Sequence, residues 1–109
     1  MIHGLRNTVV IAGQRVEMKC ETDGNFVIRE WSMQRPFTST SNREAILNNW
    51  NESMIIVNPH FGIVDGTNGS LGLYTNFTEM NDAGIYTCSV QNSGRQPEQY
   101  SAQLIVFGQ

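Results

Sequence analysis

The sequence predicts an all-β protein in which two antiparallel sheets pack as a Greek-key sandwich. Apolar residues recur at every second position over several short stretches. Turn signals separate these stretches at intervals of about 8 to 12 residues, giving eight or nine expected strands. No stretch of useful length has the helical period. The 109 residues suit one domain with one core, so residues 1–109 are expected to form a single domain, a piece of a longer extracellular protein.

The first strands are expected at residues 8–20, with a turn at Gly13, and at 27–34. Every second residue of the second stretch is assigned to the core, namely Val27, Trp31 and Met33, and the residues between them to the outer face. Arg29 falls on the core side, where an unpaired guanidinium is costly. Either the strand bulges there, or Arg29 lies at the rim with a carboxylate partner, and we favour the rim.

The remaining strands are shorter and are bounded by clear turn residues. Strands are expected at 44–47 and 53–57, and another ends near residue 65. Asn68-Gly69 then predicts a hairpin, because this dipeptide readily adopts the positive φ of a tight turn. The return strand, 70–75, buries Leu73, and the last two strands cover 85–91 and 102–106.

The two cysteines are expected to form a disulfide. Cys20 and Cys88 lie far apart, and neither has the Cys-x-x-Cys or histidine spacing of a metal or redox site. Three Asn-x-Ser/Thr acceptor sequences for glycosylation, at Asn51, Asn68 and Asn76, favour the secretory pathway as well. The sequence therefore predicts an extracellular location, at the cell surface or secreted.

Composition argues against several classes of function. A formal net charge of −3 leaves no basic stripe for nucleic acid or a membrane surface, and the apolar runs are far shorter than the roughly 20 residues that span a bilayer. His3 and His60 lack an evident catalytic partner. Asp65 and Asp82 fit a hairpin turn and a strand corner better than a calcium site. We expect no enzymatic activity, no cofactor and no metal.

Cys20, Trp31 and the run Asp82-x-Gly84-x-Tyr86-x-Cys88 resemble an immunoglobulin domain of the variable type. The resemblance spans nearly the whole chain, and the interval between the cysteines leaves room for the two extra strands of that type. The segments Cys88-x-x-x-Asn92-x-Gly94 and Ala102-x-Leu104-x-Val106 are more similar to intermediate-type adhesion domains.

The resemblance implies how the core is built. Cys20 and Cys88 would join the two sheets, with Trp31 packed on their sulfur atoms and Leu73 in the same core. Tyr86 would hydrogen-bond to backbone at a corner of the sandwich.

The resemblance also implies a corner pair. His60 stands where variable domains usually carry an arginine that pairs with the aspartate at Asp82. We therefore expect a His60–Asp82 pair, which is weaker than an arginine pair because histidine is not permanently charged.

Partners of such domains bind the sheet face that carries the Trp31 and Cys88 strands, or the loops at one end. By alternation, that outer face would display Ile28, Ser32, Gln34, Thr87, Ser89, Gln91 and Ile105. Its two isoleucines indicate either a covered face or isolated surface residues. Trp50 is expected either beneath the edge strands or as an exposed anchor at a partner surface.

Our first hypothesis is a recognition or adhesion module, the variable-type ectodomain of a cell-surface immune or adhesion receptor. It would bind a protein partner, or a second copy of itself, through the front sheet and end loops. The alternative is a secreted immune effector that binds microbial glycans or other non-self ligands through the loops at 23–27, 48–52 and 92–99. A structural spacer, the third hypothesis, predicts no ligand.

Overall fold

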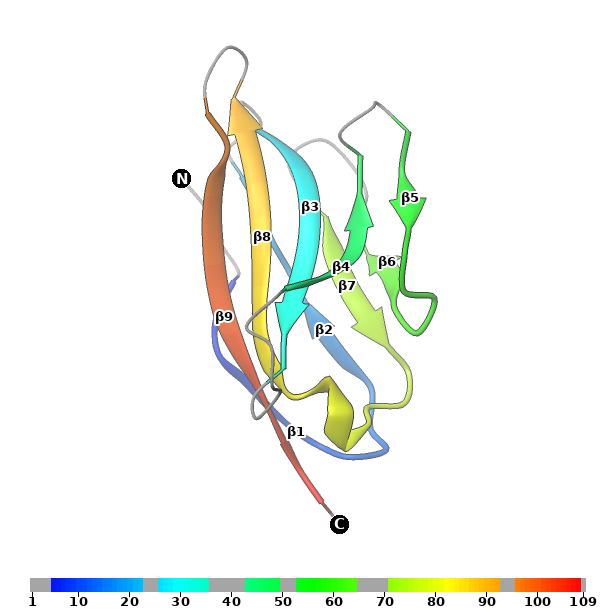
Figure 1. Cartoon of the computed structure of the whole chain (residues 1–109). Coiled ribbons are helices and arrows are strands. Elements are labelled where there is room, and N and C mark those ends of the chain that lie inside the picture. The colour runs from blue at the N-terminus through cyan, green and yellow to red at the C-terminus, as the bar shows by residue number, and fades with distance from the viewer. Residues whose placement is uncertain are drawn as a thin grey trace.

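The computed structural model is described over residues 5–22, 26–35, 43–49, 53–64, 71–92 and 96–108, and it confirms the predicted all-β sandwich (Figure 1). These residues form β1 (Thr8–Ile11), β2 (Val16–Met18), β3 (Phe26–Gln34), β4 (Glu44–Asn48), β5 (Ile55–Ile56), β6 (Gly62–Val64), β7 (Gly72–Thr75), a 3-10 turn η1 (Met80–Asp82), β8 (Gly84–Asn92) and β9 (Glu98–Phe107).

The strands form a larger and a smaller sheet. The larger sheet has the order β1-β9-β8-β3-β4-β5, and the smaller one has the order β2-β7-β6. In Figure 1 the larger sheet lies in front and the smaller one behind it. The β1–β9 pair is parallel, whereas the other pairs are antiparallel. This departs from the prediction of purely antiparallel sheets, because the chain changes sheet between β1 and β2.

Strand β3 contains a bulge that changes which side chains face the core. Ile28 and Glu30 pair with consecutive residues of β8, so Arg29 is an extra residue in β3. Because the bulge reverses the alternation on its N-terminal side, Ile28 is buried and Val27 is exposed. The predictions that Val27 faces the core and that Ile28 faces a partner are therefore wrong.

The bulge also explains how the sheet accommodates Arg29. Its guanidinium is partly buried and donates hydrogen bonds to Gln91 Oε1 (3.2 Å) and to the backbone oxygen of Asn49 (3.2 Å). Of the two alternatives, the bulge is found, and no carboxylate among the described residues pairs with Arg29 at the favoured rim position.

The core lies between the two sheets and is built from inward-facing side chains of both. Its most deeply buried members include Trp31, Met33, Tyr86, Leu73 and Leu104. Together with Val10, Val16, Ile46 and Val106, these residues form one cluster. The larger sheet therefore turns one face to the core and offers its other face as the broad outer surface of the sandwich.

Candidate interaction surface

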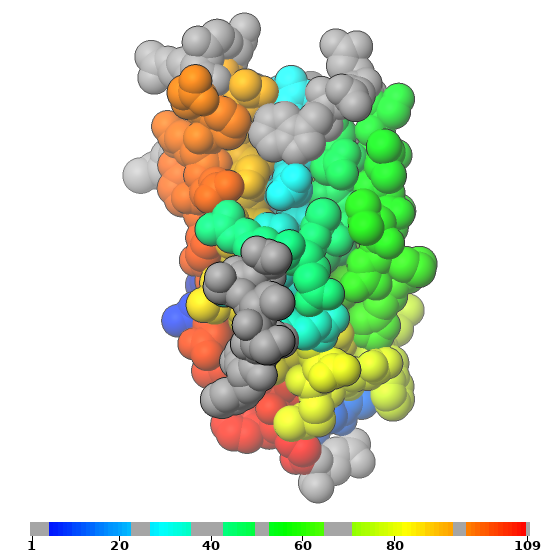
Figure 2. All heavy atoms as spheres, viewed as in Figure 1, coloured from blue at the N-terminus to red at the C-terminus, as the bar shows by residue number. Residues whose placement is uncertain are grey.

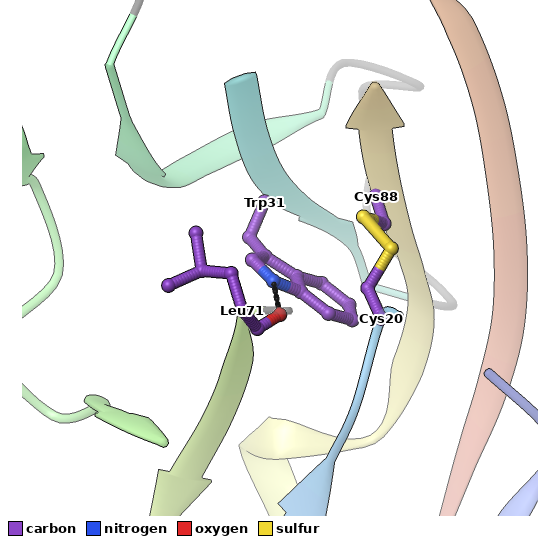
Figure 3. The surroundings of a disulfide bond; sticks show 4 residues. All are labelled: Cys20, Trp31, Leu71 and Cys88. Carbon is purple, nitrogen blue, oxygen red and sulfur yellow. Dashed lines mark hydrogen bonds between the residues drawn. A yellow bond between two sulfur atoms is a disulfide. The ribbon is translucent and has the colours of Figure 1, made fainter. Parts of the chain in front are cut away.

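A disulfide and a tryptophan hold the larger sheet against the smaller one. Cys20, which follows β2, is bonded to Cys88 on β8, with the two Cα atoms 6.6 Å apart. Figure 3 shows the indole of Trp31 between this disulfide and Leu71. Trp31 Nε1 donates a hydrogen bond to the backbone oxygen of Leu71 (2.9 Å), so the polar atom of a fully buried ring is paired. The outer face is thereby carried on a rigid frame.

The corner between β7 and β8 is organised around Asp82. Tyr86 Oη donates to the backbone oxygen of Asp82 (2.6 Å), and the Asp82 carboxylate accepts from the backbone N–H of Glu79 (2.8 Å). His60 Nε2 lies 2.8 Å from the same carboxylate oxygen. The structure thus places His60 beside Asp82, within hydrogen-bond distance of its carboxylate.

The phenol of Tyr86 is held in its neutral form. Its burial, with the Asp82 carboxylate as a smaller cause, raises the pKa of Tyr86 far above the ordinary value. Tyr86 therefore belongs to the structural frame of the sandwich.

The centre of the outer face differs from the prediction. Ser32, Thr87 and Ser89 alternate with core residues on β3 and β8, yet each is no more than 2% exposed. The prediction that these three residues are displayed to a partner is therefore wrong. Thr87 Oγ1 lies 2.9 Å from Ser101 Oγ on β9, a hydrogen bond within the sheet surface.

The entry into β4 explains this burial. The start of β4 crosses in front of β3 (Figure 1). Arg43 precedes β4 and donates from Nη1 to Gln99 Oε1 on β9 (2.8 Å). Since β3 and β8 separate β4 from β9, the Arg43 side chain spans both strands above their small residues.

Three further predicted partner residues remain partly accessible. Gln34, Gln91 and Ile105 are each half-buried. Gln91 supports Arg29, and Ile105 lies beside Val9 in the parallel β1–β9 register. These residues sit around the covered centre and do not form one continuous patch with it.

An apolar set that was not predicted from the sequence lies on the outer face near β1. Val9, Ile11, Ile85 and Phe107 are 60%, 43%, 47% and 56% exposed. Val9 pairs with Ile105, and Ile11 with Phe107, while Ile85 pairs with Gln103, two residues before Ile105. A signal was present, because Val9 and Ile11 flank the buried Val10, but the sequence did not reveal that β1 pairs with β9.

Trp50 and two predicted glycan acceptors, Asn51 and Asn68, lie outside the described residues. The third acceptor, Asn76, is exposed, and its Oδ1 accepts a hydrogen bond from Arg15 Nη1. Because arginine only donates, the amide nitrogen of Asn76 is the atom left for a glycan.

Within the described parts of the chain, no helix has the length and apolar character needed to cross a membrane. In the same residues, no three metal-ligating side chains gather into a potential metal site.

The two sheets are joined by a disulfide, and the larger sheet continues beyond β3 into β4 and β5 and carries β1 beside β9. This is the architecture of variable-type domains, which present loops and a sheet face for recognition. The chain belongs to the immunoglobulin domain family, whose model matches residues 6–100. Members of this family are typically not enzymes.

Solved structures show the same fold. A chain from the structure described as the structural basis of T cell specificity and activation by the bacterial superantigen toxic shock syndrome toxin-1 has a TM-score of 0.71 and 21% identity, covering 97% of this chain and 96% of that one. Murine CRIg has a TM-score of 0.72 and 15% identity, with coverage of 97% and 96%. A chicken TCR has a TM-score of 0.79 and 15% identity; all of this chain matches 50% of that one. No curated protein matches the sequence.

Proposed function

We propose that this chain is an extracellular recognition or adhesion module, the variable-type ectodomain of a cell-surface immune or adhesion receptor. It binds a protein partner through the outer face of the larger sheet and the adjoining end loops. The family, the disulfide and the likeness to TCR and CRIg chains support this class of function. Residues 1–109 act as one domain, and glycans on Asn51, Asn68 and Asn76 leave the binding face clear.

The apolar set on β1, β8 and β9 carries the proposal. Val9, Ile11, Ile85 and Phe107 share the outer face with the half-buried Ile105. A monomeric protein has little reason to leave aliphatic and aromatic side chains together in water, and such patches mark interaction sites. The binding surface therefore lies nearer the β1 edge than the sequence predicted, beside the centre covered by Arg43.

A matched pair of variants tests this surface. The domain, tetramerised as a probe, is applied to arrayed cell-surface ectodomains, including its own, and to arrayed glycans. Ile85→Lys should abolish binding to the protein ligand because it places a charge in the apolar contact. Ile55→Lys is the matched control, because Ile55 lies on the far edge of the sheet and is 50% exposed, close to the 47% of Ile85. It should leave the monovalent affinity for the protein ligand unchanged.

Two outcomes would overturn the proposal. One is a protein ligand that binds the parent and Ile85→Lys equally well. The other is a probe that binds only glycans and is insensitive to Ile85→Lys, which would support the secreted effector that recognises non-self ligands through its loops.

A further inference from the structure

The edge of the larger sheet opposite β1 is formed by a short apolar strand, β5. β5 is the terminal strand of that sheet, and it lies free at the right margin in Figure 1 and Figure 2. Ile55 and Ile56 are 50% and 48% exposed, and their neighbours Met54 and Val57 are similarly open. Among the described strands, β5 alone has all its residues exposed, so none of its side chains serves the protein's own core.

Such an edge is normally protected. Exposed edge strands usually carry a lysine, a proline or a bulge, because their unpaired backbone groups are a template for another strand. Residues 53–57 are Ser-Met-Ile-Ile-Val and contain none of these residues or any charge. This edge therefore lacks the usual protection, and its residues from Met54 to Val57 are all apolar.

The hydrogen bonds of β5 show which backbone groups point outward. Ile56 lies opposite Leu47 of β4, and Val57 N–H donates to the backbone oxygen of Ile46 (2.8 Å). This pattern marks Ile56 as a non-hydrogen-bonded position toward β4. Its own N–H and C=O therefore point away from β4, toward the free edge.

We propose that two copies of this chain pair laterally through β5, which joins their larger sheets into one across a two-fold axis at Ile56. In this arrangement each Ile56 exchanges two backbone hydrogen bonds with its symmetry mate. Ile55 of each copy then lies opposite Val57 of the other, so that aliphatic side chains meet on both faces of the joined sheet at residues 55–57.

The chemistry of the edge selects a second copy as its occupant. An unpaired strand edge requires another extended strand, and an uncharged aliphatic strand is complementary to itself in antiparallel pairing. A two-fold contact is closed and uses the same residues on both sides, so it ends at a dimer and does not build a fibre. The outer-face residues Ile85 and Phe107 take no part, and they remain free for the partner of the proposed function.

The size of the contact sets its strength. Four half-exposed side chains per copy cannot supply the roughly 800 Å² per partner of a standard interface, so the dimer belongs to the weak class. It forms at high concentration, or where chains are held close together on a surface that raises their effective concentration.

Neighbouring cysteine variants test the register. In the proposed pairing the two Ile56 Cα atoms lie about 5.5 Å apart, a distance that suits a disulfide. The two Ile55 residues are diagonal neighbours at about 7 to 8 Å, which is too far. Under a mild thiol oxidant, Ile56→Cys should form a covalent dimer several-fold faster than Ile55→Cys, although the parent side chains are almost equally exposed. Peptide mapping without reduction should show that Cys20 remains bonded to Cys88 in the covalent dimer.

Sedimentation at high concentration gives an independent measurement. The parent should show concentration-dependent dimerisation that Ile56→Lys removes, because two lysines would meet on the axis, and that Ile85→Lys leaves intact. Equal cross-linking rates for the two cysteine variants would overturn the proposal. A parent that stays monomeric at millimolar concentration would also overturn it, and would point to a strand from a different protein as the occupant. Neither result bears on binding through the outer face.

Discussion

At the scale of single residues, the outer face contains a buried hydroxyl that has no hydrogen-bond partner in the described parts of the chain. Ser32 Oγ makes no hydrogen bond among the described residues, although the side chain is almost fully buried beneath the entry into β4. Such a group carries an unrecovered desolvation cost of about 1–3 kcal/mol. By contrast, the neighbouring hydroxyl of Thr87 is paired with Ser101.

We therefore expect Ser32→Ala to be as stable as the parent or more stable in thermal and chemical unfolding. Thr87→Val is the matched control: it removes a paired hydroxyl with little change of shape, and it should cost about 1 kcal/mol. A Ser32→Ala variant destabilised as much as Thr87→Val would show that the Ser32 hydroxyl has a stabilising partner.

Tyr86 is expected to make the free energy of unfolding decrease at alkaline pH. Burial raises the pKa of its phenol in the folded protein, whereas the unfolded chain has the ordinary value of about 10. Above that pH the unfolded chain releases a proton that the folded chain retains. The contribution of Tyr86 to the free energy of unfolding is thus complete below pH 10. It is lost as pH rises further, and the free energy of unfolding then falls by up to about 1.4 kcal/mol per pH unit.

Urea unfolding between pH 8 and 11 measures this slope. Tyr86→Phe should lack it, while being less stable at pH 8 by about 1 kcal/mol because the hydrogen bond to the Asp82 backbone is lost. Tyr100→Phe should retain the part of the slope that belongs to Tyr86. The hydrogen bond to Glu98 also raises the pKa of Tyr100, so this variant removes only the contribution of that tyrosine. An unchanged slope in Tyr86→Phe would assign the effect to another group.

At the scale of elements, alternation predicts a strand's two faces only where the strand is regular. It correctly places Trp31 and Met33 inside, but the extra residue Arg29 reverses the faces of Val27 and Ile28. The unexpected position of Arg29 in the alternation indicated a possible bulge, but the sequence alone did not distinguish a bulge from a rim position. The cover over Ser32 is a contact between segments far apart in the chain, Arg43 and Gln99, which no local pattern records.

The start of β8 depends on a glycine that the sequence motif already contains. Gly84 has φ of +155°, and a Cβ atom there would overlap the backbone carbonyl of Gln34 at the end of β3. We expect Gly84→Ala to lower the free energy of unfolding by about 1–3 kcal/mol, because backbone on both strands must shift. Gly108→Ala is the control, since no atom lies within 4 Å of its added Cβ; equal stability of the two variants would contradict the close approach.

At the scale of the whole molecule, the frame was predictable and the proposed binding surface largely was not. Cys20, Trp31 and Cys88 are identified by residue type and spacing, because few folds need that combination. The apolar outer face depends instead on how β1, β8 and β9 are aligned. Strand order and register arise from the packing of the whole chain, so side chains that look isolated in the sequence, such as Val9 and Ile85, become members of one face.

The disulfide stabilises that frame mainly by restricting the unfolded chain. Joining residues separated by 68 positions removes loop-closure entropy worth about 4 kcal/mol in the chain-entropy model. We expect Cys20→Ala/Cys88→Ala to lose about 2–5 kcal/mol in urea unfolding, and the double variant avoids a buried free thiol. Because Trp31 still donates to Leu71 and the strand register is unchanged, any folded fraction should keep the parent's chemical shifts at Ile85 and Phe107. A double variant that unfolds at the parent's urea concentration would show that the disulfide contributes nothing to stability, whereas shifts altered across the outer face would show that the bond also shapes the native surface.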